Sequence, residues 1–279
     1  MALTQRNDPY RHWEYVHPGS GDILRIVPER GGLVTSWCCG GEERLYLDQQ
    51  RFRDQSQSVR GGIPVLFPIC GGLTGSSFAL PQHGFARDSS WKLQHLSDDQ
   101  GVKLELRDTA ESRAIYPFAF QMTMTMRLED ASLVIHTVIH NHGDEIMPFC
   151  FGLHPYFAVS DLGGVRVEGL PPEGLDQLTM NKVSTDQQID LMAEGIDLLM
   201  EPQPGNVLRL VDASAKRWVQ MELTAPMDLA VLWTDPPRPM VCLEPWTSPR
   251  QALVTGERRL DLPAGETAEF TTRFKAGLE

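Results

Sequence analysis

Regular alternation of apolar and polar residues is the feature that most constrains how this chain can fold. Every second residue is apolar between positions 121 and 128, and the same alternation recurs at 102–107 and 269–274. Successive side chains of a β-strand point to opposite faces of a sheet, so these segments predict strands with one buried and one solvated face. The more apolar run Leu133–His140 predicts a central strand.

Turn signals separate these segments and predict an all-β fold. Many short strands between such signals favour a sandwich or a barrel. The window 186–200 is the most helix-like part of the chain, although Gly195 weakens that prediction. Without an internal repeat, a low-complexity tract or a linker, we expect residues 1–279 to form a single domain. The signals are Pro18-Gly19, Gly31-Gly32, Gly40-Gly41, Gly163-Gly164 and Pro263-Ala264-Gly265.

Charge and composition exclude several classes of function. The net charge is −12 and no long basic block occurs, which argues against nucleic-acid binding. An anionic substrate would need a local cluster of arginines. The N-terminal residues are polar and no apolar run approaches the roughly 20 residues that span a bilayer, so we expect a cytoplasmic protein without a membrane partner. Five cysteines without a C-x-x-C spacing predict buried, reduced thiols.

Two segments rich in glycine, proline and aromatic residues depart from the strand pattern. The first, VRGGIPVLFPICGGL at 59–73, is either a buried turn or a loop that presents Arg60 to a ligand. The second, LPQHGFARDSSW at 80–91, sets His83 and Arg87 among aromatic rings. Rings beside polar donors suit a sugar, but a packed loop with a hydrogen-bonded histidine fits equally well.

Two further segments contain candidate proton-transfer groups. His154 lies in the apolar run FCFGLHPYF at 149–157, where a histidine is either structural or poised for proton transfer near neutral pH. Glu244 ends the apolar strand in MVCLEPWTSP at 240–249. Carboxylates are seldom buried without a partner, so Glu244 is either paired with an arginine or held for chemistry.

Together, the motifs in these four segments resemble the aldose 1-epimerase superfamily, and most closely its hexose-6-phosphate mutarotase branch, the glucose-6-phosphate 1-epimerases. Their order and coarse spacing also match, from about residue 20 to the end of the chain. The resemblance implies a galactose-mutarotase-like supersandwich of antiparallel sheets, an isomerase activity on a sugar or sugar phosphate, and neither cofactor nor metal. The motifs are RGGIPVLFP, LPQHGFARDSSW, GLHPYF and LEPW.

The resemblance also implies roles for individual residues. His154 matches the general acid that protonates the ring oxygen, and Glu244 matches the base that takes the proton of the C1 hydroxyl. The remaining matches are to substrate-binding positions. We expect the acid and the base on opposite sides of the C1–O5 unit, inside a wall of aromatic rings that raises the pKa of the glutamate. The substrate-binding matches are Arg60, His83, Arg87 and Asp176, and the expected wall residues are Phe85, Trp91, Phe157 and Trp246.

One departure from the family pattern bears on the substrate. The phosphate branch commonly carries an acidic–Asp–Arg–Tyr-like stretch after the sugar aspartate, whereas residues 194–202 here read EGIDLLMEP and lack the arginine. The ending EPWTSP also resembles the non-phosphate epimerases. Arg60 and Arg87 nevertheless favour a phosphorylated sugar, because bidentate arginines suit phosphate oxygens.

Three alternatives stay open beside anomer interconversion of an aldohexose 6-phosphate. The first is a mutarotase for free aldoses, and the second is a carbohydrate-binding protein without turnover. The third is glycoside cleavage by two carboxylates, for which Glu244 would need Asp88 or Asp176 as its partner. The sequence does not specify which hexose is used. It does not specify the oligomeric state either, and it is compatible with a monomer.

Overall fold

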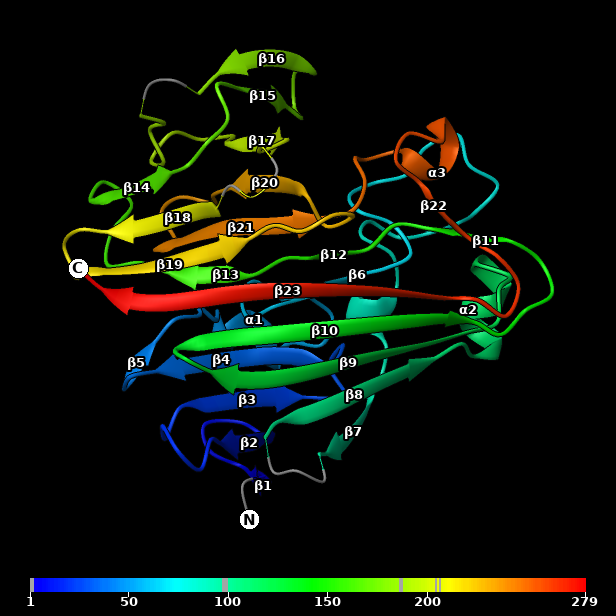
Figure 1. The fold of residues 1–279 in the computed structure, drawn as a ribbon, viewed down its shortest axis with the longest axis horizontal. Coiled ribbons are helices and arrows are strands. Elements are labelled where there is room, and N and C mark those ends of the chain that lie inside the picture. The colour runs from blue at the N-terminus through cyan, green and yellow to red at the C-terminus, as the bar shows by residue number, and fades with distance from the viewer. Residues whose placement is uncertain (1–2, 97–99, 186–187, 204, 206) are drawn as a thin grey trace.

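The computed structural model describes residues 3–96, 100–185, 188–203, 205 and 207–279. Within them, antiparallel strands make up most of the regular structure (Figure 1), which confirms the all-β prediction. The helices are short. They are α1 (Gln49–Arg53), the 3₁₀ turn η1 (Ala86–Asp88), α2 (Ala110–Ile115) and α3 (Ala252–Thr255).

One eight-stranded sheet, here called the regular sheet, has the order β14-β18-β19-β23-β10-β9-β8-β7. It contains the segments whose alternation predicted strands. Its strands are β7 (Lys92–His95), β8 (Val102–Arg107), β9 (Phe120–Glu129), β10 (Ser132–Asn141), β14 (Val165–Glu168), β18 (Val207–Asp212), β19 (Arg217–Glu222) and β23 (Thr267–Leu278).

A second eight-stranded sheet, here called the site sheet, has the order β16-β15-β17-β20-β21-β12-β6, with β13 also paired to β21. Several of its strands are very short. The eight strands of the site sheet are β6 (Val65–Leu66), β12 (Gly152–Leu153), β13 (Tyr156–Ala158), β15 (Glu173–Asp176), β16 (Asn181–Ser184), β17 (Asp197–Met200), β20 (Leu229–Trp233) and β21 (Met240–Trp246).

Two smaller sheets complete the fold. The first five strands of the chain form one sheet in sequence order, and a two-stranded ribbon pairs β11 with β22. Their bounds are β1 (Leu3–Arg6), β2 (His12–Val16), β3 (Ile23–Val27), β4 (Leu33–Cys39), β5 (Glu42–Glu43), β11 (Met147–Phe149) and β22 (Leu260–Leu262).

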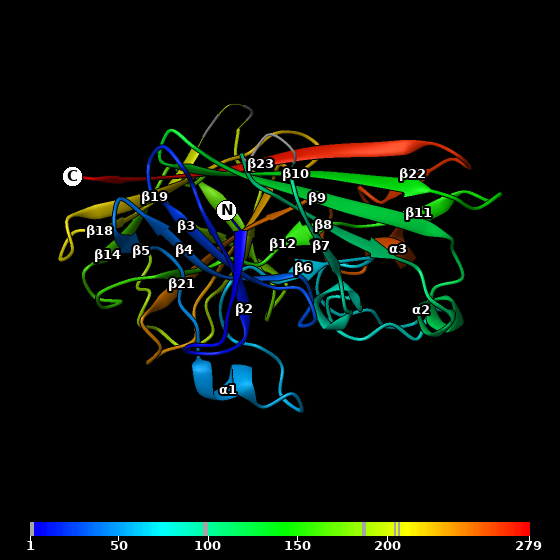
Figure 2. The same cartoon turned by 90° about the horizontal axis from the view of Figure 1, so that it is seen from below.

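The long strands of the regular sheet form one layer over the rest of the molecule. Figure 2 shows β23, β10, β9 and β8 side by side above a second layer that includes β21, β12 and β6. The main hydrophobic core takes residues from both sheets, among them Met124 and Phe274 on one side and Leu232 and Leu243 on the other. Burial of these apolar faces is the main force that holds the layers together.

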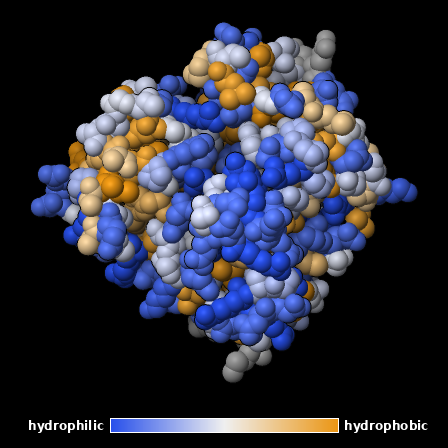
Figure 3. All heavy atoms as spheres, turned by 180° about the vertical axis from the view of Figure 1, so that it is seen from behind, coloured by the Kyte–Doolittle hydropathy of each residue, from blue (hydrophilic) through white to orange (hydrophobic). Residues whose placement is uncertain are grey.

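The predicted alternation of β9 is confirmed by its burial. Met122, Met124 and Met126 are at most 1% exposed, and the residues between them are half-buried. β10 pairs with β9 on one side and β23 on the other, which confirms the central position predicted for it. The face of the molecule opposite to that of Figure 1 is dominated by hydrophilic residues near its centre (Figure 3).

The helix-like window at 186–200 is not helical in its described part. Residues 188–196 form turns and irregular structure, and 197–200 form β17, while 186 and 187 lie outside the described residues. Gly195 adopts a φ of 79°, in the left-handed region that glycine tolerates and a helix cannot use. The helix predicted for this window is therefore wrong.

The prediction for the cysteines is largely confirmed. All five thiols are free, and only Cys38 is partly exposed, the other four being buried. No helix among the described residues has the length and apolar character needed to cross a membrane.

Candidate active site

The alternation of β21 sets the direction of Glu244. Alternate residues of a strand face the same way, so Cys242, Glu244 and Trp246 share one face of the sheet. Val241 and Leu243 face the other way and belong to the main hydrophobic core. The core therefore fixes the strand, and the carboxylate is directed away from it. Glu244 is nevertheless 1% exposed.

Strand register brings His154 to the same place. β12 and β13 both pair with β21, and residue 154 lies midway between their pairings, as residue 244 does on the partner strand. Pro155 has no N–H group to continue the ladder, so the chain leaves it at this point. The N–H of His154 donates instead to the carbonyl oxygen of Pro64, at 3.0 Å. The flanking pairs are Gly152 with Trp246 and Tyr156 with Cys242.

The two proton-transfer candidates are in direct contact. His154 Nε2 lies 3.4 Å from Glu244 Oε1. The indole N–H of Trp246 donates to the other carboxylate oxygen, Oε2, at 3.2 Å. The imidazole and the carboxylate thus lie side by side, not on opposite sides of a substrate-sized space as we expected from the resemblance.

A cavity of about 230 Å³ opens onto this pair. Five of the six predicted site residues line it, and they come from four segments that are far apart in the sequence. The cavity therefore brings together acid, base and cationic groups as a sugar site requires. Its lining consists of Ser58, Arg60, Gln82, His83, Arg87, His154, Tyr156, Asp197, Val231, Trp233, Glu244, Trp246 and Arg250.

Asp176 is the predicted residue that the structure leaves outside the cavity. Its carboxylate accepts the backbone N–H of Leu178 and the hydroxyl of Thr179, both at 2.8 Å. These bonds stabilise the turn between β15 and β16 and lower the pKa of Asp176. Asp197, the first residue of β17, lines the cavity instead. β17 is the strand beside β15 in the site sheet. The aspartate of the site thus lies in the segment EGIDLLMEP, not in GLDQL.

Arg250 is a cavity residue that the sequence did not reveal. Its Nη2 donates to Asp197 Oδ2 at 2.6 Å, and Gln177 Nε2 donates to the other oxygen at 2.8 Å. A side chain at Gly71 would reach within 2.4 Å of Arg250 Cγ, so the glycine makes room for the arginine. The only signal was its position four residues after Trp246, just past the LEPW motif.

The two predicted arginines lie near the imidazole. Arg60 stacks its guanidinium over Trp233, 5.7 Å from the ring centroid, and its Nε lies 3.8 Å from Asp235 Oδ2. Arg87 Nε is buried and makes no hydrogen bond to any described residue, although Asp88 Oδ2 lies 3.6 Å away. Burial lowers the pKa of Arg87. Both arginines line the cavity.

His83 is held as a neutral hydrogen-bond donor. The N–H of Gly71 donates to His83 Nδ1 at 3.0 Å, so the ring proton belongs on Nε2. Burial, assisted by the positive charges of Arg87 and Arg250, lowers the pKa of His83 to about 3. Gly84 is needed beside it, because a side chain there would come within 2.0 Å of the Phe67 carbonyl oxygen.

Burial shifts the pKa values of the pair in opposite directions. It raises the pKa of Glu244, with further help from the charge of Asp197, and it lowers the pKa of His154. The contact between the two groups favours an ion pair and opposes both shifts. Burial therefore disfavours the charged form of each group in the ligand-free cavity, and the contact between them limits that effect.

The aromatic wall differs from the expected one. Trp246 lines the cavity, but the other three rings predicted for it are buried in the main core. Trp233 and Tyr156 take their place, with the imidazole of His154 stacked on Tyr156 at a centroid distance of 4.7 Å. Strand alternation explains the difference at 156 and 157, because adjacent residues face opposite ways. The three core rings are Phe85, Trp91 and Phe157.

Cys242 brings a metal-ligating atom to the same place. Among the described residues, one group of three metal-ligating side chains is compact enough to hold an ion, and it consists of His154, Cys242 and Glu244. Their ligating atoms lie within 4.8 Å of one another and all three residues are buried.

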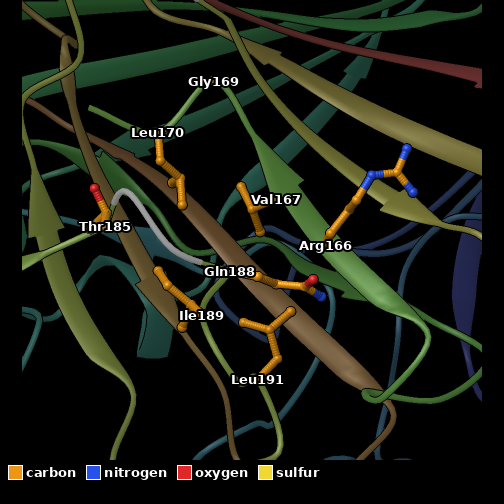
Figure 4. Close-up of a pocket in the computed structure, with 8 residues that line it drawn as sticks. All are labelled: Arg166, Val167, Gly169, Leu170, Thr185, Gln188, Ile189 and Leu191. Atoms are coloured by element: carbon orange, nitrogen blue, oxygen red, sulfur yellow. The ribbon is translucent and has the colours of Figure 1, made fainter. Parts of the chain in front are cut away.

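A second cavity, of about 360 Å³, lies between β14 and the segment that precedes β17 (Figure 4). Its lining mixes aliphatic and polar residues, and its one cation, Arg166, is bonded to Glu168 and Glu279. No acid–base pair faces it among the described residues. The cavity that contains His154 and Glu244 is therefore the candidate active site.

Comparison with known proteins gives a consistent result. The family model described as aldose 1-epimerase matches residues 21–275. A relative from Cenchrus ciliaris, named "Putative glucose-6-phosphate 1-epimerase", is 31% identical over 217 residues, 73% of this chain and 64% of its own length. The chain spans 54% and 50% of the next two curated relatives, which carry the same name.

Solved structures agree with the fold. A protein from Synechocystis sp. PCC 6803 superposes with a TM-score of 0.90 at 35% identity, over 96% of each chain. A galactose mutarotase related enzyme from Lactobacillus acidophilus superposes with a TM-score of 0.78 at 21% identity, over 95% of this chain and 97% of its own. The arrangement of antiparallel sheets is therefore that of the galactose mutarotase-like proteins.

Proposed function

The chain belongs to the aldose 1-epimerase family, and from this premise we propose that it is an isomerase that interconverts the α and β anomers of an aldohexose 6-phosphate. The observation that carries the proposal is the contact of 3.4 Å between His154 Nε2 and Glu244 Oε1 at the wall of a sugar-sized cavity. An acid and a base that adjoin each other suit this reaction, because O1 and O5 of the sugar are bonded to the same carbon.

The reaction needs two proton transfers and no redox step. Glu244 takes the proton of the C1 hydroxyl, the C1–O5 bond breaks with its electron pair on O5, and O5 takes a proton from His154. The open aldehyde rotates about the C1–C2 bond. O5 then returns its proton to His154 as it attacks the other face of C1, and O1 regains a proton from Glu244. Positioned groups of this kind typically contribute about 10²–10⁴-fold each.

Ring opening starts with the proton of the pair on His154 and with Glu244 ionised, whereas burial in the ligand-free cavity disfavours both charged forms. Sugar binding therefore has to favour the ion pair. Hydroxyl groups that donate to the carboxylate favour its ionised form, and a phosphate near the imidazole favours the imidazolium. Both changes come with a phosphorylated substrate, so the substrate itself completes the catalytic state.

The remaining residues of the cavity bind the sugar. The neutral His83 donates from Nε2 to a sugar oxygen, and Asp197, held by Arg250 and Gln177, accepts from hydroxyl groups. Asp197 takes the role that the sequence assigned to Asp176. Trp233 offers a ring face for the C–H groups of the sugar.

Two arginines support the choice of a phosphorylated substrate. Burial is the main cause of the lowered pKa of His154, and the charges of Arg87 and Arg60 lower it further, so both arginines act on the imidazole side of the cavity. Arg250 acts on the Glu244 side and is already paired with Asp197. In a chain of net charge −12, three arginines that line one cavity are the local cluster that an anionic ligand needs.

The test compares two substrates that differ only in the phosphate. We expect kcat/KM for anomer exchange to be at least about tenfold higher for glucose 6-phosphate than for glucose, since charge-assisted hydrogen bonds contribute roughly 1.5–3 kcal/mol each. NMR exchange spectroscopy at the C1 proton measures both rates. Equal or faster exchange of glucose would replace this proposal by a mutarotase for free aldoses.

A further inference from the structure

We propose that His154, Cys242 and Glu244 form a binding site for zinc or a zinc-like divalent cation, and that its occupation switches the site off. The inhibitory part rests on the proposed function, whereas the binding part does not. Cys242 is two residues before Glu244 on β21, so its thiol shares the face of the sheet that carries the carboxylate. The proposed isomerisation makes no use of that thiol.

The ligand set selects the kind of metal. Thiolate and imidazole suit zinc and other late transition metals, whereas magnesium and calcium prefer oxygen atoms alone. Zinc also accepts one carboxylate oxygen, and three protein ligands with an open fourth position are the usual composition of an accessible zinc site. Two of the three ligands, His154 and Glu244, line the cavity, so an ion bound to them can be reached from it.

The distances are close to those that zinc requires. Zinc lies about 2.3 Å from sulfur and about 2.0–2.2 Å from nitrogen or oxygen, so two ligand atoms of one ion are roughly 3.5 Å apart. His154 Nε2 and Glu244 Oε1, at 3.4 Å, already have this separation. No ligating atom of the three residues is more than 4.8 Å from another. The sulfur therefore needs to approach the other two ligand atoms by up to about 1.3 Å.

The surroundings favour moderate affinity. A histidine that holds a structural zinc usually donates its second ring nitrogen to a fixed partner, and loss of such a partner costs about 10–100-fold in affinity. His154 Nδ1 is buried and has no hydrogen-bond partner among the described residues. The site is thus suited to reversible occupation. A bound ion would engage the nitrogen and oxygen that must move protons, so sugar turnover would stop while it is present.

The binding test uses Co²⁺ as a spectroscopic substitute for zinc and needs no substrate. After treatment with EDTA and its removal, we expect added Co²⁺ to produce the near-ultraviolet charge-transfer absorption of a thiolate–cobalt bond. Cys242→Ser should lose this absorption. Cys150→Ser is the matched control, because Cys150 is an equally buried thiol in a separate hydrophobic cluster, and it should keep the absorption.

The inhibition test uses zinc chloride in the anomer-exchange assay. The unmodified chain and Cys150→Ser should be inhibited and recover on addition of EDTA, and Cys242→Ser should need at least tenfold more zinc. Cys242→Ala provides a second variant if the serine prevents folding. Absence of the thiolate–cobalt band from the unmodified chain, or equal inhibition of the Cys242 and Cys150 variants, would overturn the proposal. A chain that shows the band but exchanges no anomers would contradict the proposed function instead.

Discussion

The regular sheet and the site sheet are both eight-stranded and antiparallel, yet they use their buried positions differently. The regular sheet is built from long strands, such as β9 with 10 residues and β23 with 12, in which buried and more exposed positions alternate. In the site sheet, β6 and β12 have 2 residues each, and β21 is buried on both faces. Long alternating strands provide a stable layer, and short interrupted strands place polar groups beside a cavity.

The largest effect that we expect comes from the site sheet. His154→Ala and Glu244→Gln should each reduce kcat for anomer exchange by about 10²–10⁴-fold, because each removes one of the two proton-transfer groups. The free energy of unfolding should change by much less than the activation free energy that corresponds to this loss in kcat. Denaturant titration measures it. Loss of folding in place of turnover would mean that the pair is structural.

A substitution in the regular sheet should have the opposite profile. Leu133 in β10 is fully buried, and Leu133→Ala should lower the free energy of unfolding by about 2–5 kcal/mol through lost burial and a residual cavity. The KM and kcat of the folded fraction should stay within about twofold. A change in kcat as large as that of Glu244→Gln would show that the two sheets are not separable in this way.

Substitution of arginines also distinguishes the cavity from the regular sheet. Arg60→Gln or Arg87→Gln should raise KM for glucose 6-phosphate by about 10–100-fold, since each removes charge-assisted hydrogen bonds worth roughly 1.5–3 kcal/mol. KM for glucose should change little. Arg209→Gln in β18 is the matched control, because this arginine stacks on Trp218 in the regular sheet. If all three variants behaved alike, the effect would be one of overall charge and not of a phosphate site.

The smallest effect concerns pH, and its sign follows from the pair. Under the proposed mechanism, the free chain is active while the pair holds one proton. Because burial raises the pKa of Glu244, kcat/KM should stay constant well above the ordinary value of 4.5 and fall about tenfold per pH unit once the pH exceeds the raised pKa. Measurements belong above the pKa of the substrate phosphate, about 6. An unchanged alkaline limb in Glu244→Gln would assign it to another group.

Much of the regular sheet could be predicted from the sequence, because one period of two determines both the strand and its buried face. The site was predictable only where a short motif fixes the residue, as in HGFAR and LEPW. Asp197 and Arg250 were missed because their place depends on which strand follows which in the sheet. Asp176 was chosen in place of Asp197 although the turn after β15 uses its carboxylate. The sequence of one strand does not determine its register with a strand that is distant in the chain.

The same limit explains the geometry of the proposed catalytic pair. His154 and Glu244 were predicted as partners, but not as neighbours in contact. Their distance follows from the pairing of β12 and β13 with β21, which only the folded sheet defines. The aromatic wall was missed for a related reason, since a ring and its chain neighbour, such as Tyr156 and Phe157, face opposite sides of the strand.

The most direct test of the account is a double-mutant cycle on the pair. Anomer exchange of glucose 6-phosphate would be measured by NMR for His154→Ala, Glu244→Gln and the variant with both changes. Groups that pass one proton between them act as a unit, so the double variant should be about as slow as the slower single variant. Losses that multiply would show that the imidazole and the carboxylate act independently, and the shared-proton mechanism would be contradicted.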